Sequence, residues 1–188
     1  KTTLSATARV EVADFNGDGK SDLVVFDNGF LTIYSLNEEN KLVVLYRNSK
    51  IDTTLLTGFP SKTTTMPILI GDYNGDGKAD FMIPKAYRSS EWYKYTSTGN
   101  TMIKELKSYL PVLEKNDSDN SYNYITTDFN NDGKADLVRI QSSRDRSSNQ
   151  GSIIIGSYPN VNGDFTGNPS WAGTGNKPDI NMYALPAY

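Results

Sequence analysis

The sequence contains no cysteine and no histidine. Without cysteine the chain can form no disulfide, offers no thiolate nucleophile and cannot build a cysteine-based zinc or iron site. Without histidine it has no Ser-His-Asp triad, no imidazole general base and no imidazole metal ligand. The two absences exclude much common enzyme chemistry and argue against a zinc site.

Long hydrophobic runs and basic tracts are also missing. Apolar runs extend over only a few residues, as in Met66 to Ile70, so we expect no direct membrane insertion. The net charge is -3 and no cluster of basic residues stands out, so we expect no nucleic-acid partner. The chain opens on Lys1-Thr2-Thr3, and we expect it to be a mature chain or an excised piece of a longer one.

What the chain does contain favours strands and turns. Hydrophobic residues make up 37% of its 188 residues, and tyrosine, with 12 copies, is abundant beside Thr, Ser, Asn and Gly. This mixture suits β-strands joined by turns better than helices. The length fits one domain of ordinary size.

One acidic stretch occurs three times. Residues 14–22 read DFNGDGKSD, residues 72–80 read DYNGDGKAD and residues 128–136 read DFNNDGKAD. The copies begin 58 and 56 residues apart, and a near-constant period indicates a repeat architecture. A period of nearly 60 residues suits one four-stranded sheet with its connecting loops.

Each period contains a series of short apolar strands. The predicted strands of the first two periods are 8–13, 23–26, 30–35 and 41–47, then 66–70, 80–84, 91–96 and 101–109. In the first period Asn28-Gly29 predicts a tight type I′ hairpin. One alternative is a short helix over 101–110, because Met102, Leu106 and Leu110 fall at helical spacing.

The third period is less regular. Its predicted strands are 122–126, 136–141 and 151–158, with a polar turn over 142–150. The tail from Asn160 to Tyr188 is rich in Gly, Asn and Pro, and we expect it to be irregular with at most one strand.

Repeated four-stranded antiparallel units predict blades of a β-propeller, which is an all-β fold. We assign blade 1 to residues 1–60, blade 2 to 61–115, and blade 3 with an irregular tail to 116–188, all within one propeller domain. Three blades cannot close a ring, since propellers have about four to eight. We therefore expect either further blades of the same polypeptide outside residues 1–188 or an open array, and Tyr183 to Tyr188 stands where the period places the lead-in to a fourth loop.

The acidic loops predict about three Ca²⁺ sites. Side-chain oxygens recur at loop positions 1, 3, 5 and 9, and position 7 is expected to supply its backbone carbonyl while its ammonium group points to solvent. The predicted ligands are Asp14, Asn16, Asp18, Lys20 and Asp22; Asp72, Asn74, Asp76, Lys78 and Asp80; and Asp128, Asn130, Asp132, Lys134 and Asp136. Ca²⁺ takes six to eight oxygens in irregular geometry, whereas Mg²⁺ demands a rigid octahedron. Position 6 is Gly in all three loops and is expected to have positive φ.

Two other interpretations fit the loops less well. An ordinary hairpin turn explains one such stretch, but not three with oxygen at the same four positions. An EF-hand or dockerin loop needs a carboxylate at position 12 and flanking helices, whereas position 12 here is Val25, Ile83 and Arg139, within strand-like segments. The aromatic residue at position 2 of each loop is expected to pack between blades; these residues are Phe15, Tyr73 and Phe129.

These loops, each following one β run and preceding another, resemble the calcium loops of FG-GAP/VCBS repeats. Such repeats build the propellers of integrin α chains, several lectins and the amino-terminal regions of bacterial Rhs-type and insecticidal toxin-complex proteins. The resemblance covers most of residues 8–160 and implies a propeller with Ca²⁺ between the first two strands of each blade. It implies binding or scaffolding and not catalysis. Asn131 departs from the pattern at position 4, which needs no side-chain ligand.

The resulting functional hypothesis is a calcium-binding structural or ligand-binding propeller of a secreted or cell-surface bacterial protein, with an adhesive or toxin-related setting and a protein or glycan partner. One alternative is a lectin, in which Trp92 or Trp171 stacks on sugar rings, although we expect Trp92 to pack between blades. A second alternative is a polysaccharide lyase or hydrolase, with Glu105 and Glu114 as the first carboxylates to mutate. Nine of the 22 acidic residues are committed to the loops, and we expect no enzymatic activity.

Overall fold

A computed structural model of the chain describes residues 3–6, 8–48, 51, 67–86, 89–108, 120–145, 150–165 and 170–177, with the backbone alone at 144–145, 150–151 and 170–177. Every regular element among these residues is a β-strand. The strands form three four-stranded antiparallel sheets and one two-stranded hairpin, so the predicted all-β fold with four-stranded blades is confirmed. In the described part of the chain no helix could cross a membrane.

Each sheet is formed by strands in chain order. Blade 1 contains β1 (Arg9–Ala13), β2 (Asp22–Asp27), β3 (Phe30–Leu36) and β4 (Leu42–Asn48). Blade 2 contains β5 (Leu69–Gly71), β6 (Asp80–Pro84), β7 (Trp92–Ser97) and β8 (Met102–Lys107). Blade 3 contains β9 (Asn120–Thr127), β10 (Asp136–Asp145), β11 (Gln150–Tyr158) and β14 (Ser170–Lys177). The hairpin of β12 (Asn160–Val161) and β13 (Asp164–Phe165) is inserted between β11 and β14.

The hairpin joining β2 to β3 follows directly from its two turn residues. Asn28 and Gly29 have φ values of 49° and 79°, and Asp27 pairs with Phe30. Positive φ at both central positions is what a type I′ turn requires, because its twist matches that of the flanking strands. The sequence prediction of this hairpin is confirmed.

Two expectations for blade 3 are wrong. The expected polar turn over 142–150 is partly strand, because β10 continues to Asp145, which pairs with Gln150. The expected irregular tail contains the fourth strand of the blade, since β14 pairs with β11, and also the β12–β13 hairpin. Asn162 and Gly163, with φ values of 55° and 86°, form the turn of that hairpin and repeat the Asn-Gly signal that marked the first one. Tyr183 to Tyr188 lie outside the described residues.

The helix considered over 101–110 does not form in the described residues of that segment. All six residues of β8 pair with β7, from Trp92 opposite Lys107 to Ser97 opposite Met102. Pairing with an existing strand satisfies the backbone groups of the segment, and that tertiary ladder overrides the helical spacing of a few apolar residues.

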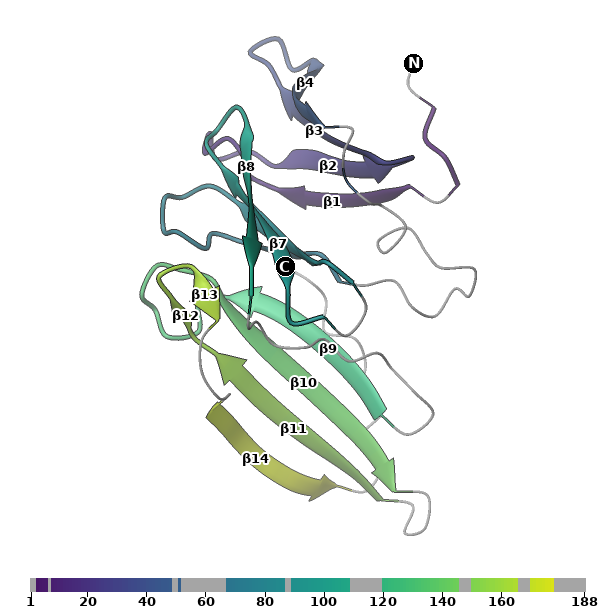
Figure 1. Cartoon of the computed structure of the whole chain (residues 1–188), viewed down its shortest axis with the longest axis vertical. Helices are drawn as coiled ribbons and strands as arrows, with labels where there is room; N and C mark the ends of the chain where they lie inside the picture. Colours follow the sequence, from purple (N-terminus) through teal and green to yellow (C-terminus); the bar gives the residue numbers. More distant parts are fainter. Residues whose placement is uncertain are drawn as a thin grey trace.

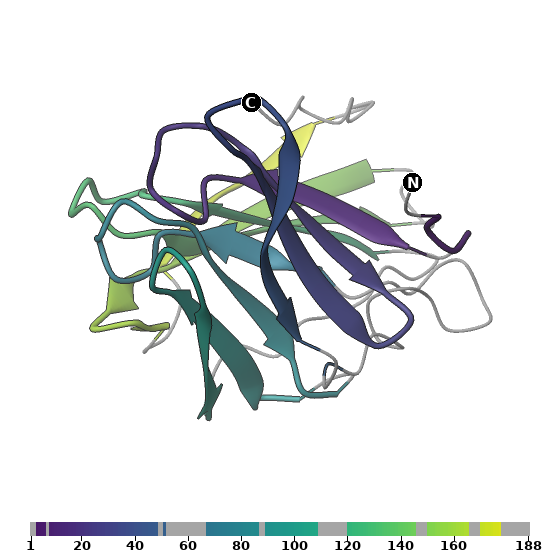
Figure 2. The same cartoon turned by 90° about the horizontal axis from the view of Figure 1, so that it is seen from above.

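The three blades stack in order, with blade 2 between blades 1 and 3, as Figures 1 and 2 show. Two hydrophobic clusters fill the two seams. In the first seam the ring of Phe81 lies edge-on to Phe26 at 5.7 Å and stacks on Tyr95 at 4.4 Å. In the second seam Trp92 is fully buried with Leu137 of blade 3, so the expected packing of Trp92 between blades is confirmed.

Candidate functional site

The three acidic loops connect the first two strands of their blades and lie along one side of the stack (Figure 1). Position 6 has positive φ in each loop, at 80°, 80° and 84°, as expected for Gly19, Gly77 and Gly133. Position 4 also has positive φ, at 78°, 78° and 61°, in a set that the sequence did not single out: Gly17, Gly75 and Asn131. Asn tolerates this conformation better than most other residues, so the third loop curls like the other two.

The carboxylate at position 1 holds the curl of each loop. In the first loop Asp14 accepts hydrogen bonds from the backbone N–H of Gly17 at 2.7 Å and of Gly19 at 2.8 Å. Asp72 accepts the equivalent pair at 2.7 Å each. Asp128 accepts the N–H of Asp132 at 3.0 Å and of Gly133 at 2.9 Å.

The oxygens at positions 3 and 5 repeat a second pattern. The Asn16 Oδ1 atom accepts the N–H of Asp18 at 2.8 Å, and Asp18 Oδ1 accepts the N–H of Lys20 at 2.8 Å. The other two loops have the same bonds, each at 3.0 Å. The Oδ1 atoms of Asn74 and Asn130 at position 3 accept the N–H of position 5, and the Oδ1 atoms of Asp76 and Asp132 at position 5 accept the N–H of position 7. Side-chain oxygens from positions 1, 3 and 5 therefore all turn in toward the backbone of their own loop.

The aspartate at position 9 is buried in all three blades. One oxygen of each accepts the N–H of the aromatic residue at position 2, at 2.9 Å for Asp22, 3.3 Å for Asp80 and 3.0 Å for Asp136. The other oxygen of Asp80 accepts the N–H of Ser97, and that of Asp136 accepts the N–H of Asn160. The corresponding Asp22 Oδ1 is buried and has no hydrogen-bond partner among the described residues.

Burial and local charge shift the pKa values of the second loop. Burial raises the pKa of Asp80 to about 6, although hydrogen bonds from Ser97 and Tyr73 and the nearby charge of Lys94 act in the opposite direction. Burial also opposes the ionisation of Asp76, but its hydrogen bonds with Lys78 and Asn74 outweigh that effect and lower its pKa.

Lys78 corrects one expectation. Its ammonium was expected to point to solvent, but the Nζ atom lies 2.8 Å from Asp76 Oδ2 at position 5 of the same loop. Its aliphatic stem crosses the seam to blade 1, where a Cβ added at Gly17 would stand 3.0 Å from Lys78 Cγ. The stem of Lys134 approaches Gly75 in the same way, with 3.5 Å to Cγ. Lys78 and Lys134 therefore each cover the loop of the preceding blade.

Main-chain hydrogen bonds join each loop to the next. The N–H of Ala79 donates to the Asp14 carbonyl at 2.7 Å, and the N–H of Ala135 donates to the Asp72 carbonyl at 2.6 Å. The Asn160 side chain adds a bond to the Tyr73 carbonyl at 2.9 Å. Loop geometry and blade stacking are thus parts of one repeating arrangement.

The aromatic residue at position 2 packs into the seam in two of the three loops. Phe15 is fully buried, with its ring edge-on to Phe81 of blade 2 at 6.4 Å. Tyr73 is fully buried against Phe165 of the β12–β13 hairpin at 5.5 Å, and its hydroxyl donates to the Leu69 carbonyl at 3.0 Å. Phe129 is 64% exposed, so for this residue the prediction is wrong. No described blade follows blade 3 and covers it.

The loops fit a calcium ion in their donor chemistry. Among the described residues, no group of three or more Asp and Glu side chains is gathered as it would be around a metal. The carboxylates hold backbone N–H groups, but each carboxylate offers about four lone-pair sites and so retains acceptor capacity. The buried, unpartnered Asp22 Oδ1 is an acceptor that a cation would satisfy. All the side chains involved present the oxygen atoms that Ca²⁺ prefers.

The other residues singled out from the sequence do not form a site in the described part of the chain. Glu105 lies on β8, the edge strand of blade 2, with its carboxylate 3.7 Å from Lys107 Nζ. Glu114 and the side chain of Trp171 lie outside the described residues. Trp92 is too deeply buried to stack on a sugar.

The fold defines a class of protein: consecutive four-stranded antiparallel sheets that are blades of a β-propeller. Residues 14–83, from the first loop through most of β6, match the FG-GAP-like repeat, which supports the resemblance to the FG-GAP family. Repeats of this kind form propeller blades.

Two curated relatives match the chain. It is 29% identical to the T-cell immunomodulatory protein homolog of Plasmodium falciparum over 116 residues, which are 59% of this chain and 15% of the relative. It is 31% identical to Protein linkin of Caenorhabditis elegans over 101 residues, which are 52% of this chain and 16% of the relative. The matched region spans only about a sixth of these relatives.

A solved structure resembles the fold as a whole. It is a lectin from Agrocybe aegerita, described for its specific recognition of non-reducing terminal N-acetylglucosamine. The TM-score is 0.52 with 16% sequence identity, covering 90% of this chain and 38% of the lectin. At this identity the likeness concerns the fold alone.

Proposed function

We propose that this chain is a calcium-stabilised propeller module that binds a protein ligand outside the cell. The observation that carries the proposal is the shared geometry of the three loops, which place oxygen atoms from positions 1, 3 and 5 inside the same curl and bury an aspartate at position 9. FG-GAP repeats occur in extracellular and cell-surface proteins, where calcium near millimolar would fill even modest sites.

Calcium would be held by the side chains at positions 1, 3, 5 and 9 of each loop, together with the carbonyl at position 7. The ion would supply positive charge to a nine-residue loop that carries three carboxylates, and so would offset their mutual repulsion. In the second loop Lys78 already neutralises part of this charge at Asp76. The role proposed for the metal is structural: it would keep each loop in the conformation that meets the next blade.

The ligand assignment predicts the calcium stoichiometry of three single variants. Asp18→Ala, Asp76→Ala and Asp132→Ala each remove the position-5 carboxylate of one loop, and each is expected to lower the stoichiometry by about one of the three sites. Titration calorimetry measures this number directly. Glu39→Ala is the matched control, because it removes one exposed negative charge outside the loops. Unchanged stoichiometry in all three loop variants would refute the assignment.

A glycan ligand is the second candidate, favoured by the likeness of the fold to a lectin. A glycan array probed with the calcium-loaded chain separates the two candidates. Binding to a defined set of sugars, lost on adding that sugar free in solution, would favour the lectin. Absence of binding across the array is the result expected for a module that binds protein.

We also propose that the module acts without catalysis. The chain has no histidine or cysteine, and Glu105 pairs with Lys107 on an edge strand. The toxin-related and adhesive settings remain predictions from the resemblance of the loops.

A further inference from the structure

Among the described residues, the stack of three blades has one face at each end against which no further sheet packs, and these are its two open faces. In blade 1 the pairing register places Val12, Leu23, Tyr34 and Val44 in one row across all four strands, on the side opposite the residues that meet blade 2. Val12 is 57% exposed and Val44 is 56% exposed. This row, with the neighbouring exposed residues Val10, Leu36 and Leu42, is the open face of blade 1.

Blade 3 has an open face of its own. Leu137 points toward blade 2, so its neighbour Val138 points away, and Ile125 lies opposite Val138 on β9. Ile125, Ile155 and Phe129 of this blade are exposed. These three exposed residues are the open face of blade 3, and Val138 between them is buried. Both ends of the stack thus present apolar side chains that the two inner seams bury.

The inner seams show what each kind of face accepts. At each inner seam the earlier blade contributes two groups of its loop, the backbone carbonyl of position 1 and the aromatic ring of position 2. The later blade contributes the backbone N–H of position 8, which donates to that carbonyl, and the lysine stem of position 7, which lies against the earlier loop. At its open face, blade 3 carries the groups that an earlier blade contributes: Asp128 is at position 1 and Phe129 at position 2. At its open face, blade 1 carries the groups that a later blade contributes: Lys20 is at position 7 and Ser21 at position 8. The two open faces are the two halves of an interface that the chain already forms twice.

We propose that the open face of blade 3 docks the open face of blade 1 of a second copy of this chain, head to tail. Phe129 then enters the new seam against Leu23, which corresponds by register to Phe81, the partner of Phe15. The N–H of Ser21 meets the carbonyl of Asp128. Two such contacts between two copies form a ring of six blades, within the about four to eight that propellers use.

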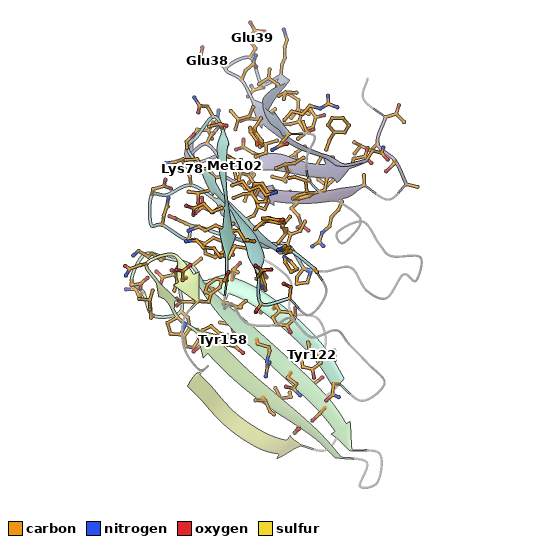
Figure 3. All side chains as sticks on the ribbon, viewed as in Figure 1. Glu38, Glu39, Lys78, Met102, Tyr122 and Tyr158 are labelled. Carbon is orange, nitrogen blue, oxygen red and sulfur yellow. The ribbon has the colours of Figure 1, made fainter. Side chains whose placement is uncertain are left out.

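Two local features weaken the contact relative to the inner seams. At position 4 the third loop has Asn131, whereas the first two loops have Gly17 and Gly75, which leave room for the lysine stem of the next blade. In the proposed contact the flexible stem of Lys20 from the second copy therefore has to shift by a few tenths of an ångström to make room for the Asn131 Cβ. The turn after β3 carries Glu38 and Glu39, which lie at the tip of blade 1 in Figure 3. The equivalent turn of blade 2, after β7, lies over the first loop, so in the proposed contact the turn with Glu38 and Glu39 lies over the third loop. Glu39 is paired with Lys41 at 2.6 Å, which leaves Glu38 as a like charge near the third loop. Calcium in that loop, or added salt, reduces this repulsion.

Sedimentation velocity across a range of concentrations tests the docking. The unmodified chain is expected to sediment as a dimer at high concentration. Phe129→Ser and Val12→Ser each remove an exposed apolar side chain from one face, and each is expected to weaken association by about tenfold or more. Ile103→Ser is the matched control on the edge strand of blade 2, where Ile103 is 53% exposed, and it is expected to change nothing.

Mixing the two weakened variants distinguishes head-to-tail docking from other modes. Each variant by itself has every interface damaged. A mixture contains one undamaged pair, namely blade 3 of the Val12→Ser chain and blade 1 of the Phe129→Ser chain. The mixture is therefore expected to associate more tightly than either variant separately. Sensitivity to Phe129→Ser without sensitivity to Val12→Ser would overturn the proposal in favour of pairing between two blade 3 faces.

The proposal is also overturned if the chain sediments as a monomer at every concentration, both in calcium and in EGTA with raised salt. That result would assign both faces to further blades of a longer polypeptide. Open assemblies longer than two copies would overturn the ring. The calcium stoichiometry of the loops is measured separately on the Val12→Ser chain, whose substitution lies outside all three loops. Failure of the docking is therefore distinguishable from failure of the proposed calcium sites.

Discussion

Calcium at about 100 times the dissociation constant of a site is expected to stabilise the folded chain by about 2.7 kcal/mol for each loop it fills. The physical reason is linkage: the folded loops gather their oxygens in a tight curl, and an unfolded chain does not. For a domain of this size, 1 kcal/mol corresponds to about 2–4 °C, so one filled loop raises the melting temperature by about 5–11 °C. Thermal unfolding followed by circular dichroism, in calcium and in EGTA, measures the shift.

Magnesium at the same concentration and ionic strength is the control for this experiment. It is expected to raise the melting temperature much less, because Mg²⁺ gives up its waters reluctantly and demands octahedral geometry. Equal melting temperatures in calcium and in EGTA would show that the loops do not bind calcium in the folded state. An equal shift with magnesium would mean that the effect is one of general charge screening.

The second large effect concerns the aromatic residue at position 2. Tyr73→Ala is expected to lower the free energy of unfolding by about 3–5 kcal/mol, as large-to-small changes of buried aromatics do. Tyr73 fills the seam between blades 2 and 3, and its truncation leaves a cavity beside Phe165 and removes the hydrogen bond to the Leu69 carbonyl. Urea unfolding, at a concentration where the chain is monomeric, measures the loss.

Phe129→Ala is the matched control, because it makes a similar truncation at the same loop position. Since Phe129 is exposed in the monomer, this variant is expected to change stability by no more than about 0.5 kcal/mol. Tyr73→Phe keeps the ring and loses the hydrogen bond from the hydroxyl to the Leu69 carbonyl, and a hydrogen bond of this kind is worth about 1 kcal/mol. Similar losses for Tyr73→Ala and Phe129→Ala would contradict the assignment of Tyr73 to a buried seam.

Local sequence signals predicted most of the strands, because these signals depend on near neighbours in the chain. Alternating residues and the Asn28-Gly29 turn specify a hairpin through backbone conformation alone. The hairpin at Asn162-Gly163 carries the same signal, but it was missed within a tail whose Gly and Pro content indicates irregular structure. The strand β14 has little strand character of its own, since Ser170–Lys177 reads SWAGTGNK, and forms only because β11 offers an edge.

The candidate site also combines features that the sequence predicts with features that depend on distant residues. The repeated positions 1, 3, 5, 6 and 9 are visible in the sequence, and the loops curl as the residue types require. Position 4 needs no side-chain ligand, as expected; its other constraints, positive φ and space for the lysine stem of the next blade, were not recognised in the sequence. That stem comes from 61 residues further along the chain in the case of Gly17 and Lys78, a distance over which sequence patterns carry no contact information.

The sequence by itself determined that this chain builds repeated β units, how many of them it contains and where each acidic loop lies, because turns, alternation and spacing are local properties. Only the tertiary structure decided which residues the seams bury. Phe15, Tyr73 and Phe129 are equivalent in the sequence, yet the first two are buried and the third is exposed. The physical reason is that burial of a position-2 ring depends on the blade that follows it. The same dependence leaves the apolar faces at the two ends of the stack open.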